Sequence, residues 1–190
     1  MALTTAQLQA IKADIAANAD MNTLPANSDG SYEIARLYNL PASPTFTVWR
    51  TDAQVSAILD AINWSLYTPN DAPDNTATYT NRTLNIQTKQ MNLQNMVIGR
   101  ERLDCSKVNI RAGLRDAVIA VPAGAGGAAV SPGGASGATV LNNCTRAATR
   151  LEKLLAVASQ GNDTTGSVTA RVMGFEGSVS YPDIDAAKAS

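Results

Sequence analysis

Few side chains in this 190-residue chain could do chemistry, and histidine is absent from it. Histidine is the commonest general base and the commonest metal ligand, so its absence excludes most catalytic triads and most metal centres. The carboxylates, such as Asp71 and Asp74 or Asp183 and Asp185, stand in polar stretches where solvated groups are expected. The sequence therefore predicts a protein that is not an enzyme, with no catalytic, cofactor-binding or metal-binding residues.

The two cysteines, Cys105 and Cys144, stand far apart in the sequence. A metal or redox site would normally show a C-x-x-C spacing or a cluster of cysteines and histidines. We therefore expect two reduced thiols that pack as small hydrophobic side chains.

A glycine-rich stretch, Gly124 to Ala129, formally matches the G-x-G-x-x-A spacing of a dinucleotide-binding turn. Its context does not fit, because Pro122 precedes it and Pro132-Gly133-Gly134 interrupts the helix that should follow. Small residues of this kind are typical of a flexible connection. We predict a flexible insert over residues 122–138, with no cofactor.

Three basic side chains, Arg146, Arg150 and Lys153, follow one another at i, i+4 and i+7. On a helix predicted from Thr139 to Ala158, this spacing would place them on one face. That face could contact a partner subunit or DNA. A solvated helix face has the same pattern, and this alternative stays open.

The C-terminal residues 168–190 are predicted to form a short β-strand or extended arm. Met173, Phe175, Val179 and Tyr181 lie on one side of a period-two pattern. The other strand-like stretch, Phe46 to Trp49, is too short to pair with the whole arm. We therefore expect the arm to pair partly with a neighbouring subunit or another protein by strand addition, so that these four residues make partner contacts.

Helical spacing of apolar residues dominates the rest of the chain. The spacing predicts a first helix opened by a capping box of Thr4 and Gln7, a second over Ser31 to Tyr38, a third from Thr51 to Leu66 opened by Thr51 and Gln54, a fourth over Thr78 to Ile98, and a fifth from Ser106 to Val121. The prediction is a mainly α protein, a helical bundle in one domain over residues 1–190.

The predicted helix over Thr78 to Ile98 has a narrow apolar seam formed by Tyr79, Ile86, Leu93 and Val97. The remaining positions carry many amides. Either another subunit covers these amides or they form an ordinary solvated face, and the sequence leaves both possibilities open.

The composition limits the classes of partner. The net charge is −1, so the whole chain carries no basic field for nonspecific nucleic-acid binding. No apolar run approaches the ~20 residues that span a bilayer, and Met1 to Asn18 lacks the pattern of a signal peptide. We expect a cytoplasmic protein with no membrane contact.

Five segments, spread in order over most of the chain, carry a resemblance to a known family. They are Asp29 to Ala35, Val48 to Thr51, Asn109 to Leu114, Ala148 to Leu154, and Met173 to Gly177. Together they resemble the head-to-tail adaptor (connector or neck) proteins of tailed bacteriophages.

The resemblance implies a structural virion protein that forms a ring, expected to be a dodecamer, beneath the portal protein and extends the DNA channel. It implies contacts with a downstream neck or tail protein, nonspecific contact with packaged DNA, and assembly in the bacterial host cytoplasm. Alternatives are another neck or tail-completion protein (a stopper or tail terminator), a small cytosolic enzyme and a DNA-binding regulator.

Overall fold

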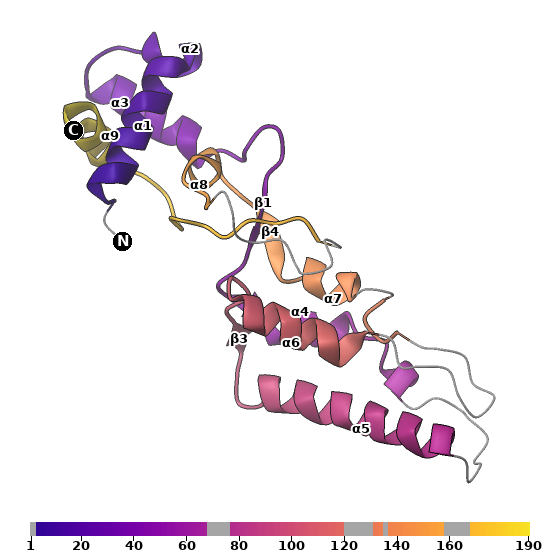
Figure 1. The fold of residues 1–190 in the computed structure, drawn as a ribbon. Coiled ribbons are helices and arrows are strands. Elements are labelled where there is room, and N and C mark those ends of the chain that lie inside the picture. The colour runs from indigo at the N-terminus through magenta and orange to yellow at the C-terminus, as the bar shows by residue number, and fades with distance from the viewer. Residues whose placement is uncertain (1–2, 68–76, 120–130, 135–136, 158–167) are drawn as a thin grey trace. The chain divides into compact units, whose positions relative to one another are not determined.

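The computed structural model describes residues 3–67, 77–119, 131–134, 137–157 and 168–190, and Figure 1 draws its helices and strands. The described part is mainly α, as predicted, with short strands that pair in twos. The chain divides into two compact units. The terminal unit comprises residues 1–48, 147–160 and 171–190, and the central unit comprises residues 49–146 and 161–170.

The terminal unit is built from helices of both chain ends. These are α1 (Thr5–Ala17), α2 (Ala19–Asn22), α3 (Ser28–Asn39), α8 (Arg150–Leu154) and α9 (Tyr181–Ala189). The predicted capping box of α1 is confirmed, since the Gln7 N–H donates to Thr4 Oγ1 at 3.3 Å and the Thr4 N–H donates to Gln7 Oε1 at 2.9 Å. The predicted second helix is confirmed as α3, which begins earlier because Asn27 caps it.

The core of the terminal unit joins residues that are distant in the sequence. Its buried members are Ile11, Ile15, Met21, Ile34, Ala35, Tyr38, Leu151, Phe175, Val179, Ile184 and Ala187. Four of these eleven belong to residues 171–190, so the C-terminal segment completes this core.

The prediction of a strand or arm at the C-terminus is wrong for residues 181–189, which form α9. The Ser180 N–H donates to the Asp183 carboxylate at 2.8 Å, and Pro182 lies in the first turn, where its missing N–H costs nothing. Before α9, Phe175 and Val179 point into the core, Met173 is half-buried and Tyr181 is 49% exposed. The four residues therefore do not form one apolar face.

The central unit contains two long helices with shorter elements around them. These elements are β2 (Ala53–Gln54), α4 (Val55–Asp60), the 3-10 helix η1 (Trp64–Tyr67), α5 (Ala77–Val97), β3 (Arg102–Leu103), α6 (Val108–Val118) and α7 (Ala138–Asn142). Two further strands, β1 (Thr47–Trp49) and β4 (Thr145–Ala147), contain two of the points where the chain passes from one unit to the other. The strand predicted at Phe46 to Trp49 is confirmed as β1.

The long polar helix is confirmed as α5, which lies along α6 in Figure 1. Ile86 and Leu93 of its predicted seam are buried, whereas Tyr79 lies outside the residues whose side chains are described. Helix α6 begins at Val108 after Lys107, and Ser106 does not cap it as predicted.

The predicted third helix is shorter than its sequence pattern. Ala53 and Gln54 pair antiparallel with Leu103 and Arg102, so the helix begins only at Val55. The predicted capping box of Thr51 and Gln54 is therefore wrong, because a pairing with a distant segment takes its place.

The prediction of one helix from Thr139 to Ala158 is also wrong. The segment divides into α7, β4 and α8, and a capping box of Thr149 and Glu152 opens the last of these. Arg146 lies in β4 of the central unit, while Arg150 and Lys153 lie in α8 of the terminal unit. The predicted basic stripe on one helix face does not form.

Most of the predicted insert over 122–138 lies outside the described residues, but its described end is packed. Pro132 and Gly133 are buried, and the Gly133 N–H donates to the Val118 carbonyl at 3.0 Å. A Cβ at Gly133 would lie 2.5 Å from Cγ2 of Val118, so only glycine fits there. The prediction of a flexible segment is wrong for these residues.

Candidate functional site

Among the described residues, four polar or charged side chains are buried: Ser31, Lys89, Arg111 and Glu152. Burying such groups costs free energy unless they are bonded, and catalytic groups are often among them. Their partners decide whether each could act on a substrate or holds the fold together.

Glu152 is 2% exposed and accepts hydrogen bonds from two backbone amides of the terminal unit. The Thr149 N–H donates to Oε2 at 2.9 Å, and the Gly177 N–H donates to Oε1 at 3.4 Å. The carboxylate thus caps α8 and also holds the chain that leads to α9. Both oxygens face the protein's own backbone, so Glu152 is a structural anchor.

Arg111 is the buried charged anchor of the central unit, as Glu152 is of the terminal unit. Its Nη1 donates to the carbonyls of Cys105 at 2.8 Å and Ser106 at 2.7 Å. Its guanidinium also lies 4.6 Å from the ring centroid of Trp49, which is fully buried. A cation over an indole in a desolvated site is a favourable arrangement.

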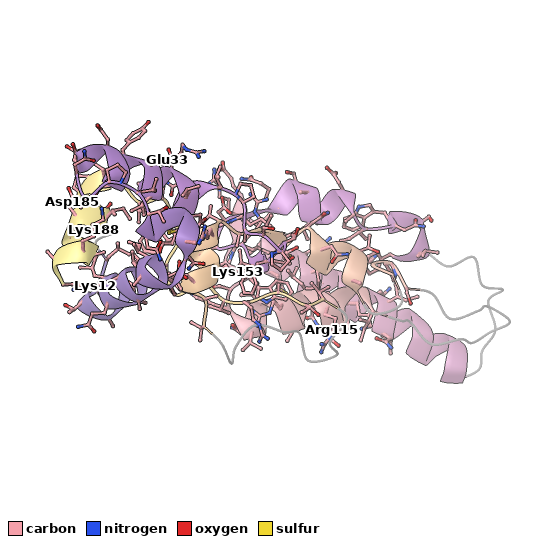
Figure 2. All side chains as sticks on the ribbon, turned by 90° about the horizontal axis from the view of Figure 1, so that it is seen from above. Lys12, Glu33, Arg115, Lys153, Asp185 and Lys188 are labelled. Atoms are coloured by element: carbon pink, nitrogen blue, oxygen red, sulfur yellow. The ribbon has the colours of Figure 1, made fainter. Side chains whose placement is uncertain are left out.

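A serine and a lysine meet in the terminal unit, where Lys188 Nζ donates to Ser31 Oγ at 2.8 Å. Such a pair can be a nucleophile and its base. Here Ser31 is fully buried and donates in turn to Asp185 Oδ1 at 2.6 Å, with Asp185 and Lys188 side by side on α9 (Figure 2). A substrate cannot reach this oxygen, and the three side chains join α3 to α9.

Lys89 joins the two long helices of the central unit. Its Nζ donates to the Asp116 carbonyl at 2.5 Å and lies 3.9 Å from Oδ1 of the same residue. The charge of Lys89 is thus satisfied at the C-terminal end of α6, where the helix dipole favours a cation.

Two basic residues of the predicted stripe, Arg150 and Lys153, have partners in the terminal unit. Arg150 pairs with Asp20, with Nη1 and Oδ2 2.5 Å apart, and its guanidinium lies 5.8 Å from the Tyr38 ring centroid. The hydrogen bond from Arg150 lowers the pKa of the Asp20 carboxyl. Lys153 lies 3.4 Å from the carbonyls of Ser43 and Pro44, and Arg146 is half-buried and also engaged.

Cys105 and Cys144 are free and fully buried, as predicted. Their thiols contact each other. Both residues also bond to the backbone of Arg50: the Arg50 N–H donates to the Cys144 carbonyl at 2.8 Å, and the Cys105 N–H donates to the Arg50 carbonyl at 2.9 Å. The pKa of the Cys144 thiol is raised well above its usual range, chiefly by the hydrogen bond with the Cys105 thiol and secondly by burial. A neutral buried thiol is a poor nucleophile.

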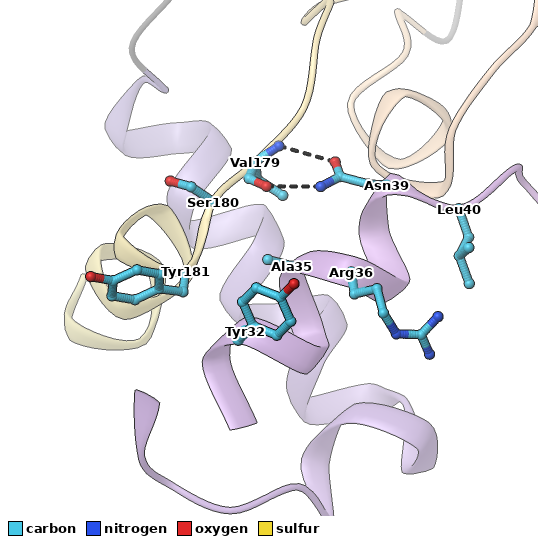
Figure 3. A pocket seen from close by; sticks show the side chains of 8 residues that line it. All are labelled: Tyr32, Ala35, Arg36, Asn39, Leu40, Val179, Ser180 and Tyr181. Atoms are coloured by element: carbon cyan, nitrogen blue, oxygen red, sulfur yellow. Dashed lines mark hydrogen bonds between the residues drawn. The ribbon is translucent and has the colours of Figure 1, made fainter. Parts of the chain in front are cut away.

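An apolar cleft of about 370 Å³ opens in the terminal unit between α3 and the residues that begin α9 (Figure 3). Tyr32, Leu40 and Tyr181 border it with exposed side chains, and Asn39 closes one side by bonding to both backbone groups of Val179. Its one charged lining residue, Arg36, pairs with Glu33 at 2.6 Å. Such a cleft can bind an apolar group, but it has no acid and base to transfer a proton.

Sequence reasoning missed both anchors, Glu152 and Arg111. The T-x-x-E spacing of Thr149 and Glu152 is a capping-box signal that could have identified one of them. Nothing in the local sequence pairs Arg111 with Trp49, since the two residues are far apart in the chain.

None of the described helices has the length and apolar character needed to cross a membrane. Within the same part of the chain, no three acidic or cysteine side chains gather closely enough to hold a metal ion. Comparison with protein-family models, with curated proteins and with solved structures finds no match to this chain.

Proposed function

We propose that this chain is a structural virion protein, a head-to-tail adaptor that forms a ring beneath the portal of a tailed bacteriophage and extends the DNA channel toward the tail. The proposal starts from the five segments that resemble adaptor proteins. Four of these segments supply the two buried anchors described above.

The proposal is supported by where the similar segments lie in the structure. Trp49 and Arg111, from the second and third segments, stack in the central unit. Glu152 and Gly177, from the fourth and fifth, are bonded in the terminal unit. These contacts engage buried side chains and join segments that are distant in the sequence, so a resemblance that lies in them supports a shared architecture.

The partners of the buried polar groups support a structural role over an enzymatic one. Each of Ser31, Lys89, Arg111 and Glu152 bonds to groups of its own unit. A catalytic group needs a face toward a cleft. Arg150 is not expected to contact DNA, because binding a phosphate would break its ion pair with Asp20.

Electron microscopy of the purified chain mixed with the portal protein of the same phage tests the proposal. We expect rings stacked on the portal and no rings on the portal of an unrelated phage. Binding to isolated tail tubes with no binding to the portal would contradict the adaptor role and favour the tail-terminator alternative.

A further inference from the structure

The two cysteines of the chain meet inside the central unit, and the proposed function gives them no role. Cys105 follows β3 and Cys144 follows α7, so the contact of their thiols joins two elements that are distant in the sequence. A thiol can pack against any apolar side chain, so packing alone does not require the two to touch. The fold thus brings together the only two side chains of this sequence that an oxidant can join to each other.

The backbone holds the two cysteines beside each other. The N–H of Arg50 bonds to Cys144 and its carbonyl bonds to Cys105, so one residue fixes both by main-chain hydrogen bonds. An S–S bond is about 2.05 Å long, so two sulfurs that are already in contact need only a short approach to form it. The central unit is therefore arranged for a bond between these sulfurs.

The interactions that such a bond would replace are weak. The Cys144 thiol donates to the Val140 carbonyl at 3.6 Å, and S–H is a poor donor. Arg111 donates to the Cys105 carbonyl at 2.8 Å, and the charges of Arg111 and Arg50 partly oppose the hydrogen bond and the burial that raise the pKa of Cys144. A thiolate that forms when the site opens therefore lies near two cations, which favour it.

We infer that Cys105 and Cys144 form a reversible disulfide that cross-links the central unit when the chain meets an oxidant such as hydrogen peroxide. In the first step one thiolate attacks a peroxide oxygen, the O–O bond breaks, and the hydroxide that leaves takes up the thiol proton to become water. The second thiol then attacks the sulfenic sulfur, forms the S–S bond and releases a second water. Two electrons pass from the sulfurs to the peroxide.

Burial of the thiols determines the rate and the product of this oxidation. Both side chains are fully buried, so peroxide reaches them only when the site opens locally, and the first step is slow. Once one sulfur is oxidised, the other thiol is already in contact with it. The disulfide therefore forms before a second peroxide can oxidise the sulfenic acid to an irreversible sulfinic acid.

The disulfide would close a loop of about 40 residues that contains α6 and α7. Such a cross-link restricts the unfolded chain and raises the melting temperature of the unit that contains it. For a virion protein, the change from a reducing to an oxidising environment comes when the particle leaves the host cell. The inference does not rest on the proposed function, because the bond can form in the isolated chain.

The test treats the purified, fully reduced chain with hydrogen peroxide. The intact mass should fall by the mass of two hydrogen atoms, and digestion without a reductant should yield one peptide that links Cys105 to Cys144. Both tryptophans, Trp49 and Trp64, belong to the central unit, so their fluorescence follows its unfolding. The melting temperature should rise by about 5 °C or more, and dithiothreitol should reverse the change.

Cys105→Ala and Cys144→Ala are matched controls, because each keeps one thiol and cannot form the bond. Each variant is compared with itself before and after peroxide, so a change in its own stability does not affect the result. The melting temperature of neither variant should rise. The same comparison excludes an effect of oxidised methionine, and either variant suffices if the other fails to fold.

The inference is overturned if both thiols of the peroxide-treated wild type still react with a maleimide in denaturant. It is overturned equally if the products are sulfinic acids or disulfides between two chains. A bond between Cys105 and Cys144 that leaves the melting temperature unchanged would overturn the stabilising cross-link. If the bond forms and stabilises the unit but the chain never binds a portal, the proposed function fails and the inference holds.

Discussion

The terminal and central units each bury a charged anchor, but the two anchors differ in sign and in kind of partner. Glu152 accepts from backbone N–H groups, which almost any residue can supply. Arg111 donates to carbonyls and also needs the indole of Trp49. The terminal unit should therefore be most sensitive to changes in how its chain segments meet, and the central unit to substitution of single side chains.

Truncation after Ala170 should have the largest effect, because it breaks the terminal unit. It removes Phe175, Val179, Ile184 and Ala187 from the core. At about 1.5–3 kcal/mol for each large buried side chain, the loss is comparable to the whole stability of a small domain. Circular dichroism should show lost helix, and limited proteolysis should cut within residues 1–48. Removal of Ser190 alone is the control, and an unchanged helical signal after truncation would contradict this description of the core.

Trp49→Ala tests the sensitivity of the central unit. The substitution leaves a cavity and removes the ring beneath Arg111, so we expect a loss of about 3–5 kcal/mol in the free energy of unfolding. Urea denaturation measures it, and Trp49→Phe, which keeps an aromatic ring, should cost less. A loss below about 1 kcal/mol would mean that Trp49 does not hold this unit together.

Glu152→Gln tests the buried anchor of the terminal unit. The amide keeps one acceptor oxygen but replaces the other with a donor, so one of the two backbone N–H groups loses its partner. We expect a loss of about 1–3 kcal/mol by urea denaturation. Glu176→Gln, at an exposed carboxylate nearby in the sequence, should have little effect. Equal losses in the two variants would show that Glu152 has no special role.

Tyr67→Phe should give the smallest effect and one that depends on pH. The Tyr67 hydroxyl donates to the Ala117 carbonyl at 2.7 Å, so its loss should cost about 1 kcal/mol at neutral pH. Burial raises the pKa of Tyr67 to about 12, above the ordinary value of 10.0. The unfolded chain therefore releases this proton first, and the contribution of Tyr67 is lost as pH rises from 10 to 12.

The measurement is the difference in unfolding free energy between wild type and Tyr67→Phe at several pH values. The difference should be constant below pH 10 and should shrink above it. A difference that grows with pH would have the wrong sign for a buried neutral tyrosine.

Sequence reasoning succeeded where local signals determine the structure. The capping box at Thr4, the apolar spacing of α3 and the length of α5 are properties of neighbouring residues. It failed where distant segments compete, as at Ala53 and Gln54, where strand pairing with Leu103 and Arg102 displaces a helix start.

Two further predictions were wrong because a local signal for a helix start was outweighed by the spacing of apolar residues around it. The S-x-x-D spacing of Ser180 and Asp183 with Pro182 marks the start of α9, yet the alternation of Phe175, Val179 and Tyr181 favoured a strand. Thr149 and Glu152 mark the start of α8 inside a segment whose apolar spacing suggested one long helix. The pairing of Arg111 with Trp49 has no local signal, so the anchor of the central unit could not be predicted.

The division of the terminal unit among both chain ends also bears on synthesis. Ribosomes release α1 and α3 first, but the side chains that complete their core, from Phe175 to Ala187, emerge last. Most of the central unit is a continuous stretch, residues 49–146, and can fold while synthesis continues. The apolar faces of α1 and α3 must therefore wait, uncovered, until translation reaches α9, and an interruption of translation before that point leaves a nascent chain prone to aggregate.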